Sequence, residues 1–441
     1  MKPYTTIILG AGGRDFHNFL TYFKNNPTFK VVAFTASQIP GIEKRSFPKK
    51  LAGKSYKKDI LIYSENYLPR LIRKFNVDYC FLSYSDLSHQ EVMEKASLVL
   101  ASGANFALLG TKDTMIQPKK PVISITAVRT GCGKSQTSRK VAEILQTIGK
   151  KVVAIRHPMP YGNLMKQRCQ RFATYPDLKK QHVTIEEREE YEPWIERDIV
   201  VYAGVDYEMI LRKAEREADV IIWDGGNNDL SFFKSDLNIV VVDSLRSGHE
   251  LTYYPGFVNF LLADVIVINK IDTAHKKDID IIKKHVQQYN PHAQLIFAKS
   301  HLTVDYPELL RGKNALVVED GPTLTHGGMS YGAGTVAAHL FKVKRIVDAR
   351  KYAVGSILDV YKKYSHLQKI LPAMGYSAKQ ISELQQTINK AKCDLVIDGS
   401  PVNISRLLRV NKPVINVHYE LEDFGTVRLE SILKEFIKRK K

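Results

Sequence analysis

The chain has few cysteines and no long apolar run. Its 441 residues include four cysteines, scattered at positions 80, 132, 169 and 393. This spacing excludes a disulfide framework and a paired-cysteine metal site. No apolar run is long enough to span a bilayer, and the opening residues, MKPYTTIILGAGG, have the pattern of a strand rather than of a signal peptide. The sequence therefore predicts a cytoplasmic protein that does not bind a membrane.

Acidic residues are in deficit. Lys plus Arg is 65 against 46 for Asp plus Glu, which gives a formal net charge of +19. Such an excess favours polyanionic partners: nucleic acid, an anionic membrane or a small ligand with several phosphates. No stretch interleaves basic and aromatic residues as nucleic-acid modules do. We therefore expect a small phosphorylated substrate, and we expect the basic residues 438–441 to form a solvated tail.

One stretch has the pattern of a phosphate-binding P-loop. An apolar run over residues 122–128 predicts a buried strand, and a glycine loop and a helical pattern follow it. Glycines let successive N–H groups surround phosphate oxygens, Lys134 would reach the β- and γ-phosphates, and Ser135 would bind Mg²⁺. Val128 stands at the position of the motif's first glycine, so a simple turn is the alternative. The expected nucleotide-binding residues are Thr130, Gly131, Cys132, Gly133, Lys134, Ser135 and Gln136.

Two later strands end in residues that suit a nucleotide site. The apolar run 218–223 ends in Asp224, an arrangement in which a buried strand presents a carboxylate to Mg²⁺. The run 263–268 ends in Asn269-Lys270-Ile271-Asp272. This ending resembles the base-recognition motif of P-loop GTPases, in which the Asp accepts two hydrogen bonds from guanine. It favours GTP, and the alternative is a strand that simply ends in polar residues.

Cationic side chains follow other predicted strands. Arg156 and His157 end the strand 151–155, and prolines would hold the turn 158–160 rigid. We expect this pair to bind a substrate phosphate, with plain surface charge as the alternative. Arg246 and His249 follow the strand 237–242 in a similar position.

The first 118 residues begin with a Rossmann-type βαβ pattern. A strand over 5–9, a glycine turn and a helix precede a second strand over 31–34. Asp15 replaces the third glycine of the dinucleotide motif, which weakens a dinucleotide site. Arg14 and His17 lie at the mouth of the predicted sheet and could hold an anion there. The alternative is that Asp15 and Asn18 merely cap the helix.

Three other segments carry local predictions. Residues 184–191 predict an acidic helix with a solvated face. Residues 317–335 form a glycine-rich loop between a strand and a helix, which predicts a second anion site. Residues 295–298 predict a strand that ends in a turn at Lys299-Ser300, and a helix is expected through Leu407.

The alternation of strands and helices predicts an α/β protein with mostly parallel sheets. A polar, proline-containing segment at 117–121 marks the end of the first domain. We expect a Rossmann-like domain over residues 1–118, a P-loop nucleotide-binding domain over 119–342 and a small α/β region over 343–441.

A family resemblance rests on the phosphate loop and three further motifs: Gly12-Gly13-Arg14-Asp15-Phe16-His17-Asn18-Phe19, Arg156-His157-Pro158-Met159-Pro160-Tyr161-Gly162 and Glu319-Asp320-Gly321-Pro322-Thr323. These motifs are similar to those of the cyclic 2,3-diphosphoglycerate synthetase family, archaeal enzymes with GTPase-like bacterial relatives. The resemblance covers nearly the whole chain. It implies a cytoplasmic, Mg²⁺- and K⁺-dependent ligase that uses ATP to close 2,3-diphosphoglycerate into an intramolecular phosphoanhydride, releasing ADP and phosphate.

Joining two phosphates beside ATP brings repelling charges together, so the site needs fixed cations and N–H donors. We expect catalytic roles for Lys134, Arg129, Arg156, His157 and Asp224, and substrate binding by Arg14, His17, Arg246 and His249. ATP is the expected nucleotide, and Asn269, Lys270 and Asp272 leave GTP open. A homodimer is expected as the commonest assembly.

Two other functional classes remain open. A regulatory or chaperone GTPase would hydrolyse its nucleotide without diphosphoglycerate and would act on a protein partner. A nucleic-acid-binding protein, which the net charge alone suggests, would bind strands with a steep salt dependence.

Overall fold

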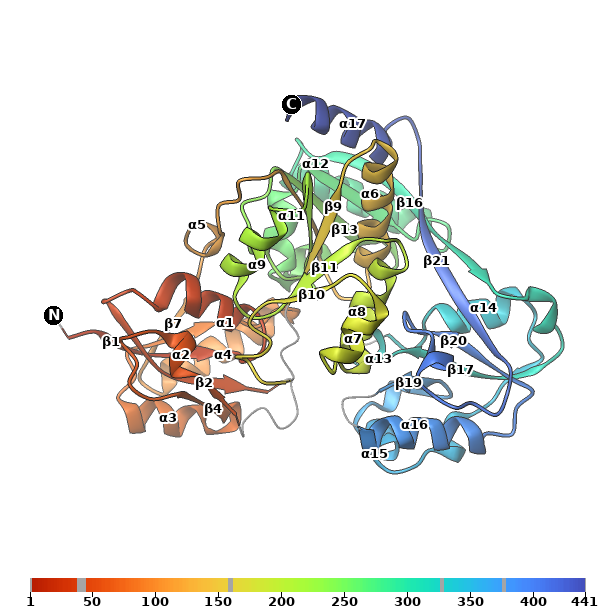
Figure 1. Cartoon of the computed structure of the whole chain (residues 1–441), viewed down its shortest axis with the longest axis horizontal. Helices are drawn as coiled ribbons and strands as arrows, with labels where there is room; N and C mark the ends of the chain where they lie inside the picture. Colours follow the sequence, from red (N-terminus) through yellow and green to blue (C-terminus); the bar gives the residue numbers. More distant parts are fainter. Residues whose placement is uncertain (1, 38–44, 158–161, 326–328, 375–377, 441) are drawn as a thin grey trace. The chain divides into compact units, whose positions relative to one another are not determined.

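The computed structural model describes residues 2–37, 45–157, 162–325, 329–374 and 378–440. The chain forms two compact units. The first comprises Met1–Arg171, Val200–Phe297 and Phe424–Lys441, and the second comprises Phe172–Ile199 and Ala298–Asp423. The predicted boundaries at residues 118 and 342 fall inside these units, so the division into three domains remains a prediction. Strands and helices alternate throughout, which confirms the predicted α/β class (Figure 1).

The first unit begins with a small sheet, the N-terminal sheet. Its strand order is β3-β4-β2-β1-β5-β7, and its neighbours are parallel except for β3 and β4. Phe16, Phe19 and Phe23 follow the first glycine turn and pack together in its core. The bounds are β1 Tyr4–Leu9, β2 Phe29–Ala36, β3 Ser46–Phe47, β4 Ile60–Ser64, β5 Tyr79–Leu82 and β7 Asn105–Leu108, with α1 Arg14–Asn18, α3 Leu68–Phe75 and α4 His89–Ala101.

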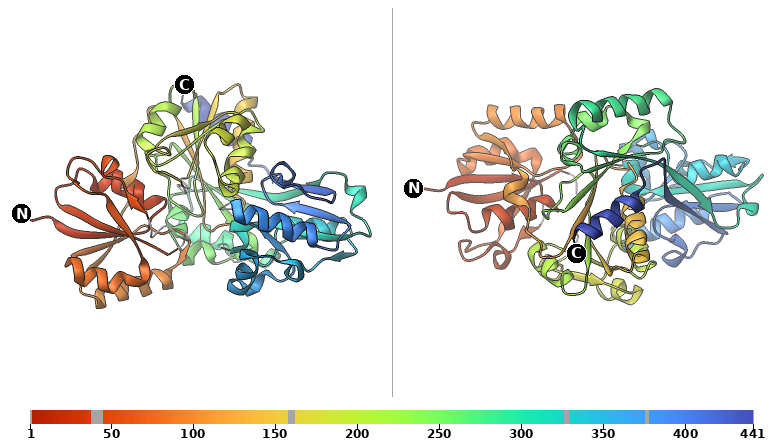
Figure 2. Two further views of the ribbon diagram at one scale, coloured as in Figure 1. Left: turned by 60° about the horizontal axis from the view of Figure 1, so that its bottom comes forward. Right: turned by 90° about the horizontal axis from the view of Figure 1, so that it is seen from above.

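The second sheet of this unit, the P-loop sheet, has the order β11-β9-β12-β8-β13-β15-β16. Its strands are almost continuously apolar because they are buried on both faces, and helices flank them (Figure 2). The strands are β8 Val122–Ala127, β9 Val152–Arg156, β11 Val200–Ala203, β12 Val220–Asp224, β13 Leu237–Asp243, β15 Val265–Asn269 and β16 Gln294–Val304. The longer helices are α6 Lys134–Thr147, α9 Tyr207–Ala214, α11 Gly256–Leu262, α12 Lys276–Tyr289 and α17 Leu429–Arg439.

Parallel strands bring their carboxyl ends to one edge of the P-loop sheet. The register places Asp224 beside Ile125 of β8 and Arg156 of β9, and it places Asp243 beside Asn269. Since β8 lies between β12 and β13, the two carboxylates flank the strand from which the P-loop leaves. This is the edge at which ligands bind in open α/β sheets.

A short antiparallel pair ties the N-terminal part of the unit to the P-loop part. Strand β6 (Leu87–Ser88) follows β5, and it pairs with β14 (Tyr253–Tyr254), which precedes α11. This pairing brings the loop after β5 close to the P-loop.

The second unit has the strand order β21-β20-β17-β18, with β19 beside β17. The predicted turn at Lys299-Ser300 is wrong, because β16 continues through it to Val304. The predicted helix through Leu407 is also wrong, since a 3-10 turn over Ile404–Arg406 stands there. The bounds are β17 Asn314–Asp320, β18 Arg345–Ile346, β19 Leu371–Ala373, β20 Leu395–Gly399 and β21 Val414–Phe424, with α14 Ala333–Leu340, α15 Ser356–Lys363 and α16 Ala378–Lys390.

The predicted acidic helix forms as α8 (Ile185–Ile195), but its predicted solvation is wrong. Glu187 and Glu192 are buried. Glu187 closes a capping box by accepting from the Thr184 N–H, and Glu192 pairs with Arg188 at 2.7 Å. These local partners compensate the two carboxylates for the loss of water.

The basic C-terminal residues extend α17 to Arg439, and Lys440 forms an ion pair with Asp236. The described end of the chain is therefore partly anchored. The remaining short elements are α2 Lys49–Ala52, α5 Thr111–Thr114, β10 Gln170–Phe172, α7 Tyr175–Lys180, α10 His249–Thr252 and α13 Gly321–Thr325. Within the described ranges, no helix has the length and apolar character needed to cross a membrane.

Candidate active site

The P-loop is supported by side chains from the end of β15. Asn269 Nδ2 donates to the Cys132 carbonyl at 2.9 Å, and Lys270 Nζ donates to the Gly131 carbonyl at 2.8 Å. Gly133 has a φ of 102°, and a Cβ at this position would lie 2.1 Å from Asn269 Nδ2. Glycine is therefore required at Gly133 by both conformation and space.

Asp243, at the end of β13, links two of the cations around the P-loop. Its carboxylate accepts from Arg246 Nε at 3.0 Å and from Lys270 Nζ at 2.8 Å. Arg246 also donates to the Thr130 carbonyl at 2.7 Å. Burial raises the pKa of Asp243, but the charges of Lys270 and Arg246 outweigh burial, so the pKa is lowered overall. Asp243 therefore stays ionised and fixes both cations against the loop.

Asn269 and Lys270 thus support the loop, a role separate from the predicted recognition of guanine. Asp272, which was expected to accept the hydrogen bonds of the base, is exposed. It has no hydrogen bond to the part of the chain that the structure describes. Guanine recognition by this motif remains a prediction.

Asp224 connects the P-loop helix to β9. Its carboxylate lies 2.9 Å from Lys134 Nζ and 2.5 Å from Arg156 Nη1, and it accepts from Ser138 Oγ at 2.8 Å. All of these side chains are buried. Burial by itself raises the pKa of Asp224, but Arg156 and Lys134 outweigh it and hold the pKa at about 2. The lysine of the P-loop therefore lies beside a carboxylate that is ionised at neutral pH.

Ser135 and Asp224 carry oxygen atoms of the kind that bind a magnesium ion, and in the structure both oxygens of Asp224 already contact Lys134, Ser138 or Arg156. The Ser135 hydroxyl has no hydrogen bond to another described residue, and Asp224 is ionised. Hydroxyl and carboxylate oxygens are the ligands that Mg²⁺ prefers. Elsewhere in the described ranges, no group of three or more His, Cys, Asp or Glu side chains could hold a metal ion.

Four of the nucleotide-binding residues predicted in the P-loop are buried: Thr130, Cys132, Lys134 and Gln136. Burial raises the pKa of Cys132 to about 11, so its thiol is protonated at neutral pH and is not a nucleophile. Gln136 is buried in the first turn of α6. A direct contact of either residue with a nucleotide remains a prediction.

Arg129, in the P-loop, contacts residues from several elements. Its Nε donates to Asp86 Oδ1 at 2.7 Å, and its guanidinium lies 3.6 Å from the centroid of the Tyr253 ring. Arg129 Nη1 lies 3.2 Å from His249 Nδ1. Burial, together with Arg129 and Arg246, lowers the pKa of His249 to about 4. His249 is therefore neutral near pH 7, which corrects its predicted role as a cation.

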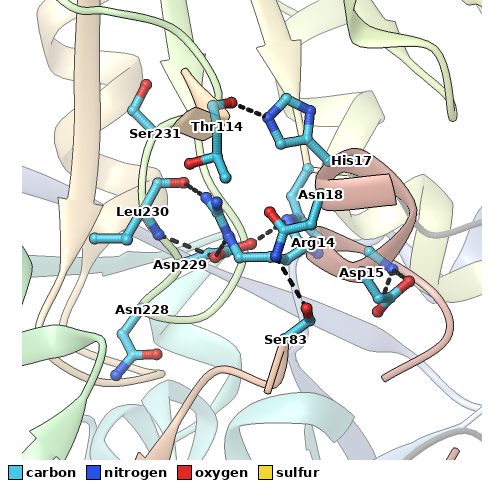
Figure 3. Close-up of polar contacts among 12 residues, drawn as sticks. Arg14, Asp15, His17, Asn18, Ser83, Thr114, Asn228, Asp229, Leu230 and Ser231 are labelled. Carbon is cyan, nitrogen blue, oxygen red and sulfur yellow. Dashed lines mark hydrogen bonds and ion pairs between the residues drawn. The ribbon is translucent and has the colours of Figure 1, made fainter. Parts of the chain in front are cut away.

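Arg14 and His17 lie in a buried polar network instead of an open anion site (Figure 3). Arg14 Nε lies 2.5 Å from Asp229 Oδ1. His17 Nε2 donates to the Thr114 carbonyl at 2.6 Å, and its ring stacks on Phe232 with 3.9 Å between centroids. Burial and the charge of Arg14 lower the pKa of His17 to about 3. A neutral, stacked imidazole does not bind an anion as a cation, so this prediction is corrected.

Asp15 fills the glycine turn that follows β1. Its carboxylate accepts the N–H groups of Gly12 at 2.8 Å, Gly13 at 3.1 Å and Phe16 at 2.7 Å. These are the donors that a dinucleotide phosphate would use in a Rossmann turn. Asp15 therefore fills the turn itself. It is not the helix cap of the alternative prediction, because Gly13 is at the N-cap of α1 and no side chain among the described residues caps the helix. Asn18 does not cap the helix either, since its Nδ2 donates to Ser83 Oγ at 2.9 Å (Figure 3).

His157 lies at the end of β9, next to Arg156. Its backbone N–H donates to the Asp224 carbonyl at 3.3 Å, and its Nδ1 lies 3.1 Å from Asp229 Oδ2. The rest of the predicted rigid turn, residues 158–161, lies outside the described residues. Lys134 and Arg156 both pair with the Asp224 carboxylate, whereas the His157 side chain lies against Asp229. The predicted roles of these residues toward a substrate phosphate remain predictions.

The second anion site predicted over residues 317–335 is wrong for the start of α14, and residues 326–328 of that segment lie outside the described residues. The buried carboxylate of Glu319 accepts the N–H groups of Gly332 at 3.1 Å, Gly334 at 3.0 Å and Thr335 at 2.7 Å. The donors at the start of α14 are therefore taken by the protein itself. A carboxylate from the preceding strand stands where an external anion was expected.

No role was predicted from the sequence for Asp86, Asp243 or Asp229. Asp243 ends an apolar strand as Asp224 does, so the same signal could have identified it. Asp86 has a φ of 60°, which is not visible as a pattern of residues. Asp229 meets Arg14 across 215 positions of sequence, and no local pattern predicts that pair.

Comparison with known proteins gives two sequence relatives. The chain is 59% identical over 437 residues to arginine synthetase ArcE of Thermococcus kodakarensis, covering 99% of this chain and 98% of that protein. It is 23% identical over 400 residues to the cyclic 2,3-diphosphoglycerate synthetase of Thermococcus sibiricus, covering 82% of this chain and 88% of that protein. No family model matches the chain.

Among solved structures, LpxK from Aquifex aeolicus in complex with ATP aligns with a TM-score of 0.46 and 14% identity. The alignment covers 79% of this chain and 95% of that one.

These comparisons correct the predicted product. Formation of cyclic 2,3-diphosphoglycerate is wrong for this chain, because the relative with 59% identity over nearly its whole length is an arginine synthetase. Of the motifs behind the resemblance, the phosphate loop and the segment around Arg14 lie in the first unit, whereas Glu319 lies in the second unit and accepts the N–H groups at the start of α14. The coarser prediction of an ATP-dependent ligase is confirmed. The chain belongs to the arginine synthetase ArcE family.

Proposed function

We propose that this chain is an ATP-dependent ligase that forms arginine. The observation that carries the proposal is its 59% identity to arginine synthetase ArcE over 99% of its length. The P-loop, with Lys134 at 2.9 Å from the ionised Asp224, supplies the phosphoryl-transfer half of such a reaction.

The chemistry of the product suggests the acceptor. Arginine differs from the ureido amino acid citrulline in having nitrogen in place of the ureido oxygen, and that oxygen is a poor leaving group. In the proposed reaction the ureido oxygen attacks the γ-phosphorus of ATP, the bond from the γ-phosphorus to the bridging oxygen breaks, and ADP leaves. Ammonia then bonds to the ureido carbon through its lone pair. The carbon–oxygen bond breaks, and phosphate leaves with one proton from the nitrogen.

The charges around the P-loop suit the first step. Lys134 and the loop N–H groups would stabilise the negative charge on the transferring phosphoryl group. Arg129 and Arg156 are buried nearby, and each is held by a carboxylate. Ser135 and Asp224 would hold Mg²⁺, which neutralises phosphate charge in such sites. The use of GTP, dependence on K⁺ and a homodimer remain predictions from the sequence.

The test is to supply the purified protein with Mg²⁺, ATP, citrulline and ammonium, and to quantify arginine and ADP by mass spectrometry. We expect equimolar arginine and ADP that require all three substrates, with ATP preferred over GTP. Lys134→Ala is the control that should abolish both products. Release of ADP without arginine would refute the proposal and would favour a nucleotide-hydrolysing regulator.

A further inference from the structure

The imidazole of His157 lies in a narrow slot between two glycine turns of the first unit. A Cβ at Gly13, in the turn after β1, would lie 2.7 Å from His157 Nε2. A Cβ at Gly226, in the loop after β12, would lie 2.5 Å from His157 Cγ. Side chains do not approach one another this closely, so both positions must lack a Cβ for the ring to lie where it does. The two turns together leave room for one planar ring.

A buried carboxylate holds one nitrogen of this ring. The Asp229 side chain is 0% exposed, and its Oδ1 lies 2.5 Å from Arg14 Nε. Its Oδ2 lies 3.1 Å from His157 Nδ1, which is close enough for an ion pair, but the geometry of this contact is not that of a hydrogen bond. Burial raises the pKa of the Asp229 carboxyl, but the neighbouring charge of Arg14 opposes burial, and the pKa is lowered overall. An ionised carboxylate beside Nδ1 favours the tautomer in which Nδ1 carries the proton. Nε2 is then a hydrogen-bond acceptor.

The backbone of His157 is joined to the phosphate site through Asp224. The His157 N–H donates to the Asp224 carbonyl, and the Asp224 carboxylate pairs with Lys134 of the P-loop helix. The His157 side chain is 19% exposed, whereas that of Asp224 is 1% exposed. In the described part of the chain, His157 Nε2 has no hydrogen-bond partner. The ring is thus held by the two glycine turns and lies beside a buried carboxylate, and its Nε2 is not engaged by another described residue.

We propose that His157 Nε2 accepts a hydrogen bond from the nitrogen nucleophile, taken as ammonia, and so directs its lone pair at the activated carbon. The inference rests on the proposed ligase function and names the residue that faces the second substrate. Ammonia has no carbon skeleton that packing could hold, so hydrogen-bond acceptors must orient it. His157 orients the nucleophile, and Asp229 is a positioning residue that fixes the tautomer and the ring.

The first test compares His157→Asn and His157→Gln with the wild-type full chain at saturating ATP and citrulline. Ammonium is varied, and arginine and ADP are both quantified. His157→Asn has no atom at the Nε2 position, so we expect the KM for ammonium to rise about tenfold or more. ADP should then exceed arginine, because water competes for the activated carbon. His157→Gln, whose amide reaches further, should recover part of the arginine yield, and the KM for ATP should not change.

The glycines provide a second test that leaves His157 intact. Gly13→Ala and Gly226→Ala would displace the ring, so we expect each to raise the KM for ammonium and the ratio of ADP to arginine. Gly110→Ala is the matched control. It lies in the same N-terminal part, and a Cβ there meets no atom within 4 Å. We expect it to behave like the wild type.

The outcomes separate the two proposals. If the wild type forms no arginine, the ligase function itself fails. If the wild type forms arginine and His157→Asn keeps both the wild-type KM for ammonium and equimolar products, the inference is overturned and the ligase function stands. If His157→Asn and the glycine variants raise only the KM for ATP, His157 serves the phosphate side and the inference is likewise overturned.

Discussion

Asp86 and Arg129 join the N-terminal part of the first unit to the P-loop through a 2.7 Å hydrogen bond from Arg129 Nε to Asp86 Oδ1. Asp86 has a φ of 60°, a left-handed conformation that is unfavourable for most residues with a side chain. Its N–H donates to Asn228 Oδ1 at 2.7 Å, which helps to hold this conformation. A nearly buried carboxylate is thus kept in a strained place where it fixes a P-loop cation. We infer that Asp86 positions Arg129.

Removal of Asp86 should therefore impair catalysis through Arg129. A charge-assisted hydrogen bond of about 2 kcal/mol predicts that Asp86→Ala lowers kcat ~30-fold. The check is a double-mutant cycle on arginine formation with Arg129→Ala. Because both changes remove the same interaction, the double variant should be little worse than the more damaging single variant. Additive losses would contradict a positioning role for Asp86.

Removal of the Lys134 charge should stop phosphoryl transfer. Lys134→Met should lower kcat by about 100- to 1000-fold, as loss of one charge-stabilising group does in other enzymes. The measurement is the rate of ADP release. Lys140→Met, on the same helix, is the matched control and should retain activity. Normal ADP release by Lys134→Met would show that α6 does not carry the P-loop lysine.

The pair of Arg14 and Asp229 should be important for stability. The two side chains are 7% and 0% exposed, and removal of one partner leaves a buried charge without its counterpart. Arg14→Met should lower the free energy of unfolding by about 3–5 kcal/mol, measured by urea denaturation. Arg171, whose side chain is 45% exposed, pairs with Glu217 and serves as control. Arg171→Met should cost less than about 1 kcal/mol. Equal losses for the two variants would contradict this assignment.

His17 should make stability depend on pH between about 6.5 and 3. Its pKa is about 3 in the folded chain and near 6.5 when unfolded, so the unfolded chain binds an extra proton in this window. The stability that His17 contributes is therefore fully present above pH 6.5 and is lost as the pH falls. One such group gives a slope of about 1.4 kcal/mol per pH unit.

The measurement for His17 is urea denaturation at pH 7, 6 and 5. His17→Gln keeps a donor for the Thr114 carbonyl but does not titrate. As the pH is lowered, the free energy of unfolding of the variant should therefore fall less steeply than that of the wild type, by about 1.4 kcal/mol per pH unit. Identical slopes for the wild type and the variant would mean that His17 is protonated in the folded chain.

The predictable parts of the site are those that depend on neighbouring residues in the sequence. The P-loop follows from a strand, two glycines and a helix over residues 122–147, and β12 follows from an apolar run that ends in Asp224. The acidic residues in α8 were recognised, but their burial was not. The pair of Arg188 and Glu192 is local, whereas the burial of Glu192 depends on how the helix packs, which the sequence pattern does not show. The family resemblance indicated the ligase class and missed the acceptor, since the relative with 59% identity is an arginine synthetase.

The sequence by itself determined the α/β class, the P-loop at Gly131–Ser135 and the strand-end carboxylate Asp224. Only the tertiary structure decided which charges meet. It placed Asp229 between Arg14 and His157, and it placed the Glu319 carboxylate where it accepts the N–H groups at the start of α14. It also made His17 neutral by burying it beside Arg14. The physical reason is that protonation and ion pairing depend on burial and on neighbouring charges. Contacts such as that of Arg14 with Asp229 join residues 215 positions apart, beyond the reach of any local pattern.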